Sequence, residues 1–124
     1  MENNDHAILF ARLKKLLLPY SKKMEVRTDT ASNYHLYIVK EIVLAGKKVA
    51  ECYFCGLKIN HSMVSFYFFP YYSHPQVLSV PPSIQKNLKG KTCFNFKQLN
   101  SGQEEAIAAL LKDGEMLYKK EHIL

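Results

Sequence analysis

The sequence predicts a two-layer α+β domain, with N-terminal and C-terminal helices packed on one face of an antiparallel sheet of about five strands. Apolar residues recur at helical spacing near both ends of the chain, whereas the middle of the chain alternates with the period of a strand. Short turns separate the strands. Such turns join antiparallel neighbours, because parallel neighbours need a crossover of about a dozen residues. Helices at the ends of a chain that surround a central sheet indicate the α+β class.

The N-terminal helix is predicted from an apolar stripe that consists of Leu9, Leu13, Leu16, Leu17 and Tyr20. One of three polar residues can cap its first turn, namely Asn3, Asn4 or Asp5. Pro19 ends or kinks this helix near Leu18, because proline cannot continue a helix. The C-terminal helix is predicted to begin at a capping box formed by Ser101 and Glu104. Its buried stripe is expected to consist of Ile107, Leu110, Leu111 and Leu117. Gly114 costs about 1 kcal/mol relative to alanine inside a helix, so we expect a bend or fraying there.

The strands are predicted from alternating apolar and polar residues between turn signals, at Met24–Thr28, Tyr34–Leu44, Val49–Ile59, Met63–Phe69 and Lys91–Lys97. A proline-rich connection over residues 70–82 separates the last two, followed by a short helix over residues 82–88. On the Met63–Phe69 strand, Tyr67 points to the face opposite Phe66, so neither face is clearly polar. The open face of the sheet should therefore be covered by the proline-rich connection, by a ligand or by a second chain.

Length and composition indicate one domain over residues 1–124 and exclude a disordered chain. Apolar residues make up 48% of the 124 residues and charged residues 23%, which is ordinary for a globular domain. No apolar run approaches the ~20 residues of a membrane-spanning helix. The first five residues are acidic and polar, unlike a secretory signal, and three cysteines do not make a disulfide framework. We therefore expect a cytoplasmic protein.

Two segments carry a resemblance to a known family. The residues Val64–Pro70 (VSFYFFP), the proline-rich connection and the residues Gly90–Lys97 (GKTCFNFK) resemble the YdhG-like domains of small uncharacterised bacterial proteins. The resemblance is good over residues 63–120, whereas the first half of the chain resembles the family only in the order of its elements. It implies a helix-flanked antiparallel sheet, frataxin-like in outline, and no agreed catalytic residues. One branch of the family is described as an intracellular iron chaperone. The resemblance therefore implies iron handling as one expected role of this chain.

The distribution of charge is the most informative feature of the sequence. The chain carries a net charge of +6, and no acidic residue lies between Glu51 and Glu104. The intervening stretch holds five lysines and ten of the fifteen aromatic residues. The lack of acids disfavours sites there for Ca²⁺, Mg²⁺ or ferrous iron, which prefer oxygen ligands. Lysines interleaved with aromatic residues are typical of surfaces that bind single-stranded nucleic acid.

Catalytic and metal motifs are not evident. Cys52 and Cys55 have the spacing of redox and zinc sites, but on a strand they are expected to point to opposite faces as structural residues. The five histidines lie apart, and none forms an i, i+4 metal-binding pair. The sequence therefore predicts no catalytic residue, no metal ligand and no cofactor, although distant groups can converge in a fold.

The leading hypothesis is a non-catalytic cytosolic binding or interaction module. It would form a homodimer through its sheet or proline-rich connection, or bind a small anionic or aromatic ligand on the open face. The runner-up is nucleic acid or another polyanion, bound through the basic aromatic half from Lys58 to Lys97. Iron handling ranks third, since the acidic residues are spread along half the chain. The residues expected near the groove are Tyr67, Tyr71, Tyr72, His74, Lys91, Asn95 and Lys97.

Overall fold

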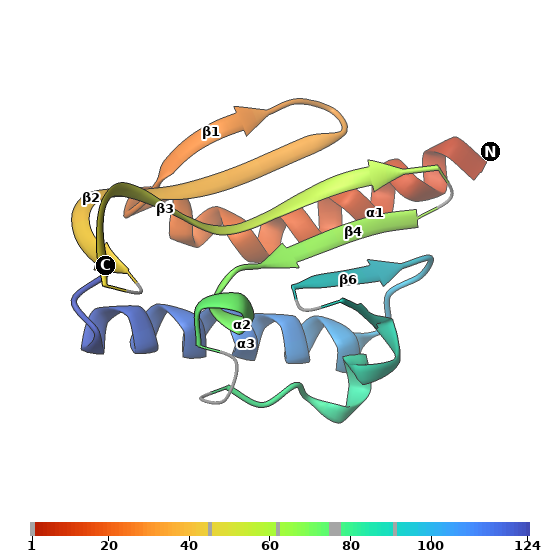
Figure 1. Ribbon diagram of the computed structural model, residues 1–124. Coiled ribbons are helices and arrows are strands. Elements are labelled where there is room, and N and C mark those ends of the chain that lie inside the picture. The colour runs from red at the N-terminus through yellow and green to blue at the C-terminus, as the bar shows by residue number, and fades with distance from the viewer. Residues whose placement is uncertain (1, 45, 62, 75–77, 91) are drawn as a thin grey trace.

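The architecture is an open antiparallel sheet with helices from both ends of the chain, as seen in a computed structural model that describes residues 2–44, 46–61, 63–74, 78–90 and 92–124 (Figure 1). The helices are α1 (Glu2–Leu17), α2 (Pro70–Ser73) and α3 (Ser101–Lys120), with 3-10 turns η1 (Leu18–Lys22) and η2 (Pro82–Asn87). The strands are β1 (Glu25–Asp29), β2 (Asn33–Leu44), β3 (Lys47–Asn60), β4 (Met63–Phe68), β5 (Leu88–Lys89) and β6 (Cys93–Phe96). The predicted α+β class is confirmed.

The sheet has six strands in the order β1-β2-β3-β4-β6-β5, and every neighbouring pair is antiparallel. The prediction of about five strands missed β5, which is two residues long and follows η2. The core lies between the sheet and the two long helices. On the sheet it is built from Leu57, Phe66 and Phe94, which are fully buried and paired across adjacent strands. The helices of the described ranges leave the other face of the sheet uncovered, and we call it the open face.

A bulge in β3 changes which side chains reach the open face. Leu36 lies opposite Cys55 and Tyr37 lies opposite Tyr53, so Phe54 is an extra residue in β3. Because of this residue, Cys52 and Cys55 both point to the helix-covered side, where both are buried. The expectation that they point to opposite faces was wrong, because the strand is not regular between them. The same bulge places Tyr53 on the open face.

Helix α3 differs from the prediction at its start and along its buried side. Its N-cap is Asn100, which forms the capping box with Gln103, one residue before the predicted pair. The helix continues past Gly114 without fraying. A side chain there would come within 2.6 Å of Phe68 Cζ, so glycine allows the helix to lie close to the sheet. Tyr118, absent from the predicted stripe, is fully buried. Among the described residues, no helix is long and apolar enough to cross a membrane.

The proline-rich connection adds to the helix-covered side. Tyr71 is buried, with its ring centroid 5.2 Å from that of Phe68 and 5.9 Å from that of Phe94. Its hydroxyl donates to the carbonyl of Ser79 at 2.8 Å, which holds the connection against the core. The described part of the connection therefore contributes to the core, and of the three alternatives for covering the open face, the one that used this connection was wrong.

Candidate functional site

The open face carries a row of cross-strand partners near its middle. His35 on β2 lies opposite Gly56 on β3, which lies opposite Tyr67 on β4, followed by Cys93 on β6. Directly paired residues project from the same side of a sheet. Around this row, six residues line a hollow of about 410 Å³, which we call the tyrosine hollow: Asn33, His35, Tyr37, Tyr53, Lys58 and Tyr67.

Gly56 gives the tyrosine hollow its floor. A Cβ atom at this position would overlap His35 Nδ1 and Tyr53 Oη, which meet above the glycine. Without a side chain there, these two atoms lie 2.8 Å apart in a hydrogen bond. The His35 ring centroid is 5.7 Å from that of Tyr53 and 6.4 Å from that of Tyr67. The glycine therefore allows a histidine and two tyrosines to form one aromatic cluster on an otherwise pleated surface.

The imidazole in this cluster is neutral at pH 7. Burial lowers the pKa of His35 from its usual 6.5, and the positive charge of Lys58 lowers it further. Burial also raises the pKa of Tyr53, so its hydroxyl keeps its proton. Since Asn33 Oδ1, 3.4 Å from His35 Nε2, can only accept, the proton belongs on Nε2, and Nδ1 accepts from the Tyr53 hydroxyl. Lys58 is thus the one cation among the six lining residues, and none of them is acidic.

Ion pairs close the β1 side of the tyrosine hollow. The Arg27 guanidinium lies 4.4 Å from the centroid of the Tyr37 ring, in a cation–π arrangement. The same group pairs with Glu25 at 2.6 Å and with Glu51 at 2.9 Å. This pairing lowers the pKa of Glu51. The carboxylates nearest this end of the face are therefore engaged by Arg27.

A second hollow lies at the other end of the open face. This hollow of about 440 Å³, the edge hollow, is lined by Met63, Asn87, Lys89, Asn95, Lys97, Gln98 and Gln103. Between the two hollows, Ser65 donates to Asn95 Oδ1 at 2.6 Å and accepts from Asn60 at 2.9 Å. Because Ser65 is buried, this hydrogen-bond network links the two hollows beneath the surface of the open face.

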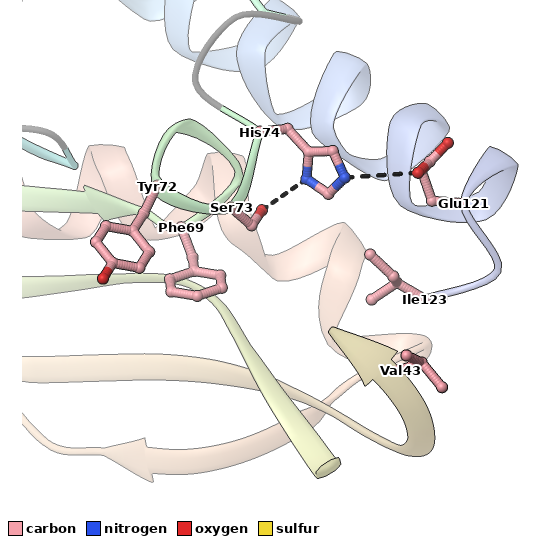
Figure 2. A pocket seen from close by; sticks show the side chains of 7 residues that line it. All are labelled: Val43, Phe69, Tyr72, Ser73, His74, Glu121 and Ile123. Atoms are coloured by element: carbon pink, nitrogen blue, oxygen red, sulfur yellow. Dashed lines mark hydrogen bonds and ion pairs between the residues drawn. The ribbon is translucent and has the colours of Figure 1, made fainter. Parts of the chain in front are cut away.

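A third hollow lies where α2, the end of β2 and the residues after α3 converge (Figure 2). This C-terminal hollow, of about 290 Å³, is lined by Val43, Phe69, Tyr72, Ser73, His74, Glu121 and Ile123. Its dashed contacts join Ser73 Oγ to His74 Nδ1 at 2.9 Å and His74 Nε2 to Glu121 Oε1 at 3.6 Å (Figure 2). These three residues have the side chains of a serine hydrolase triad.

The backbone around this triad does not suit acyl transfer. An acyl-transfer site needs donors aimed at the oxyanion of the tetrahedral intermediate. The amides of Tyr72 and Ser73 both donate to the carbonyl of Phe69, and that of His74 donates to Pro70. Ser73 Oγ is also hydrogen-bonded to the buried hydroxyl of Tyr118. This arrangement fastens the end of α3 to α2, and we interpret it as structural.

The seven residues predicted for the groove lie in several places. Tyr67 lines the tyrosine hollow, and Asn95 and Lys97 line the edge hollow. Tyr72 and His74 line the C-terminal hollow, and Tyr71 belongs to the core. Lys91 lies outside the described residues. The structure therefore brings these residues to separate sites instead of one groove.

Four of the six lining residues, namely Asn33, His35, Tyr37 and Tyr53, were not predicted from the sequence, and neither was the role of Gly56. The available signal was spacing: His35 and Tyr37 are two positions apart on one predicted strand, and Gly56 and Lys58 are two positions apart on the next. Residues two positions apart on a strand project from the same face. Tyr53 breaks this alternation because of the bulge. Its place could not be predicted without the register of the β2–β3 pair.

The cysteines lie in surroundings that suppress the thiolate. Burial raises the pKa of Cys52 to about 11, raises that of Cys55 well above its usual value and raises that of Cys93. All three thiols are free. Among the described residues, no group of three or more His, Cys, Asp or Glu side chains is placed to hold a metal ion.

Comparison of the chain with protein-family models, with curated proteins and with solved structures gives no match. The resemblance to YdhG-like domains stays a prediction from the sequence.

Proposed function

We propose that this protein is a non-catalytic binding module whose tyrosine hollow binds a planar aromatic anion. One observation supports this: a floor at Gly56 surrounded by tyrosine rings and Lys58, with no acid among the lining residues. Tyrosine rings provide flat apolar surface with a polar edge, which suits a heteroaromatic ring. Lys58 provides a charge-assisted hydrogen bond to an anionic group. The neutral imidazole of His35 adds a further ring surface and carries no charge that would attract the anionic group away from Lys58.

Adenosine 5′-monophosphate is a suitable probe, because it carries one ring system and one phosphate. Isothermal titration calorimetry should give measurable binding for the nucleotide, and weaker binding for adenosine and for inorganic phosphate, which each lack one half. Changing Lys58 to glutamine should weaken nucleotide binding at least tenfold, as a charge-assisted hydrogen bond contributes roughly 1.5–3 kcal/mol. The matched control is Lys47→Gln, an exposed lysine of the same strand.

Comparison of Tyr67→Leu with Lys58→Gln separates stacking from charge. Tyr67→Leu should weaken the nucleotide and adenosine alike, because it removes a ring surface and leaves Lys58 in place. Lys58→Gln should leave adenosine binding unchanged. If the nucleotide binds the Lys58→Gln variant as tightly as the original protein, the tyrosine hollow is not its site.

The predicted homodimer calls for a control on the same face. A second copy seated on the open sheet would cover the same tyrosines and would compete with the nucleotide. Native mass spectrometry at several protein concentrations, with and without the nucleotide, distinguishes the two. A dimer that dissociates when the nucleotide is added would place both partners on one surface.

A further inference from the structure

On the open face, a row of polar cross-strand partners joins the two hollows, and its middle member, Ser65, is buried. Lys58 of the tyrosine hollow is paired with Ser65, and Ser65 is paired with Asn95 of the edge hollow. Beyond Asn95, β5 adds Lys89, which lies opposite Cys93. The row therefore leads from the tyrosine rings to two lysines at the far edge, Lys89 and Lys97.

The length of this surface exceeds a single nucleotide. Four strand spacings separate β2 from β5, and each is about 4.8 Å, so the two ends lie about 19 Å apart. At the 3.4 Å rise per nucleotide of one strand in helical DNA, that span corresponds to about six nucleotides. A ligand that reaches from His35 on β2 to Lys89 on β5 must therefore be a chain.

The charge of the surface favours a polyanion. Residues 52–103 contain no Asp or Glu, so no acid lies on β4, β5 or β6, or on β3 beyond Glu51. The three lysines that line the two hollows, Lys58, Lys89 and Lys97, are all exposed. Lysines along a track neutralise backbone phosphates, and aromatic rings beside them stack with unpaired bases. A duplex would keep its base faces covered and could not use the rings.

We infer that the open face binds single-stranded nucleic acid, with bases against the tyrosine hollow and the backbone continuing to Lys89 and Lys97. This inference rests on the proposed function for one of its two ends. It adds the class of ligand, a single strand, and a second contact region that a mononucleotide does not reach.

The test compares a short strand with a mononucleotide on the same variants. A fluorescently labelled thymidine oligonucleotide of roughly 12 residues, within the usual site sizes, is titrated by fluorescence anisotropy at several salt concentrations. Three lysine contacts predict that the logarithm of affinity falls with the logarithm of salt at a slope of about −2. The Lys89→Gln/Lys97→Gln variant should reduce the slope to about −0.7. It should leave binding of adenosine 5′-monophosphate unchanged.

A matched control is Lys112→Gln/Lys120→Gln, which removes the same charge from exposed positions of α3. The control should keep the original slope. If the double variant at residues 89 and 97 behaves like this control, or if a duplex binds as tightly as the single strand, the inference is overturned while mononucleotide binding stands. If neither the oligonucleotide nor the mononucleotide binds, the proposed function fails as well.

Discussion

Replacing Gly56 by alanine tests whether the floor of the tyrosine hollow requires a glycine. A Cβ atom there overlaps His35 Nδ1 and Tyr53 Oη, so the hydrogen bond between them must break or the two side chains must move. Loss of one hydrogen bond costs about 1 kcal/mol, and an extra carbon in a packed region costs about 1–3 kcal/mol. Alanine recovers roughly 0.5–1 kcal/mol of backbone entropy relative to glycine. The net expectation is a loss of about 2 kcal/mol in the free energy of unfolding.

Equilibrium unfolding in urea, followed by far-ultraviolet circular dichroism, measures this loss. The matched control is Gly102→Ala, where the nearest atom to the added carbon is Asn100 Oδ1 at 3.4 Å. This position lies in the first turn of α3, so alanine should leave stability unchanged or raise it by up to about 1 kcal/mol. A Gly56→Ala variant as stable as the original protein, with unchanged nucleotide affinity, would refute the argument that glycine shapes the hollow.

Substitutions of Gly114, Asn100 and His35 test helix packing, helix capping and titration, respectively. Gly114→Ala should lower the free energy of unfolding by about 1 kcal/mol, despite the better helix propensity of alanine, because its methyl group meets Phe68; a more stable variant in urea unfolding would contradict this. Asn100→Ala should cost about 1 kcal/mol and Ser101→Ala almost nothing, since Asn100 is the N-cap; equal losses would contradict the assignment. The pKa of His35 is lower in the folded protein than in the unfolded chain, so on acidification the unfolded chain binds a proton first. The contribution of neutral His35 to stability is therefore fully present above about pH 6.5 and is lost as the pH falls through the folded-state pKa. Urea unfolding from pH 7.5 to pH 5 should show a shallower decline for His35→Gln, and parallel declines would contradict this reasoning.

The sequence predicted most of the fold because periodicity and turn chemistry act locally. The apolar stripe of α1 and the alternation of β4 are properties of consecutive residues, and both are found where the sequence placed them. The capping box was displaced by one residue because Asn100 and Ser101 are both good N-caps, and side-chain packing decides between them. The two residues of β5 carry too little pattern to be recognised.

The candidate site could be predicted only in part, because it depends on register between strands. Tyr67 was predicted from the phase of its own strand, which needs no partner. The pairing of His35 with Gly56 depends on the register between β2 and β3, and the approach of Tyr53 depends on the bulge that follows. A bulge shifts the phase of one strand relative to its neighbour by one residue, and its position is fixed by tertiary packing.

A nuclear magnetic resonance titration of isotopically labelled protein with adenosine 5′-monophosphate locates the bound nucleotide residue by residue. The proposed function predicts that amide resonances shift around the tyrosine hollow, with Gly56 and Lys58 among the largest changes, while residues of the edge hollow remain unchanged. Shifts concentrated at Ser73 and His74 in the C-terminal hollow, or no shifts at millimolar nucleotide, would contradict it.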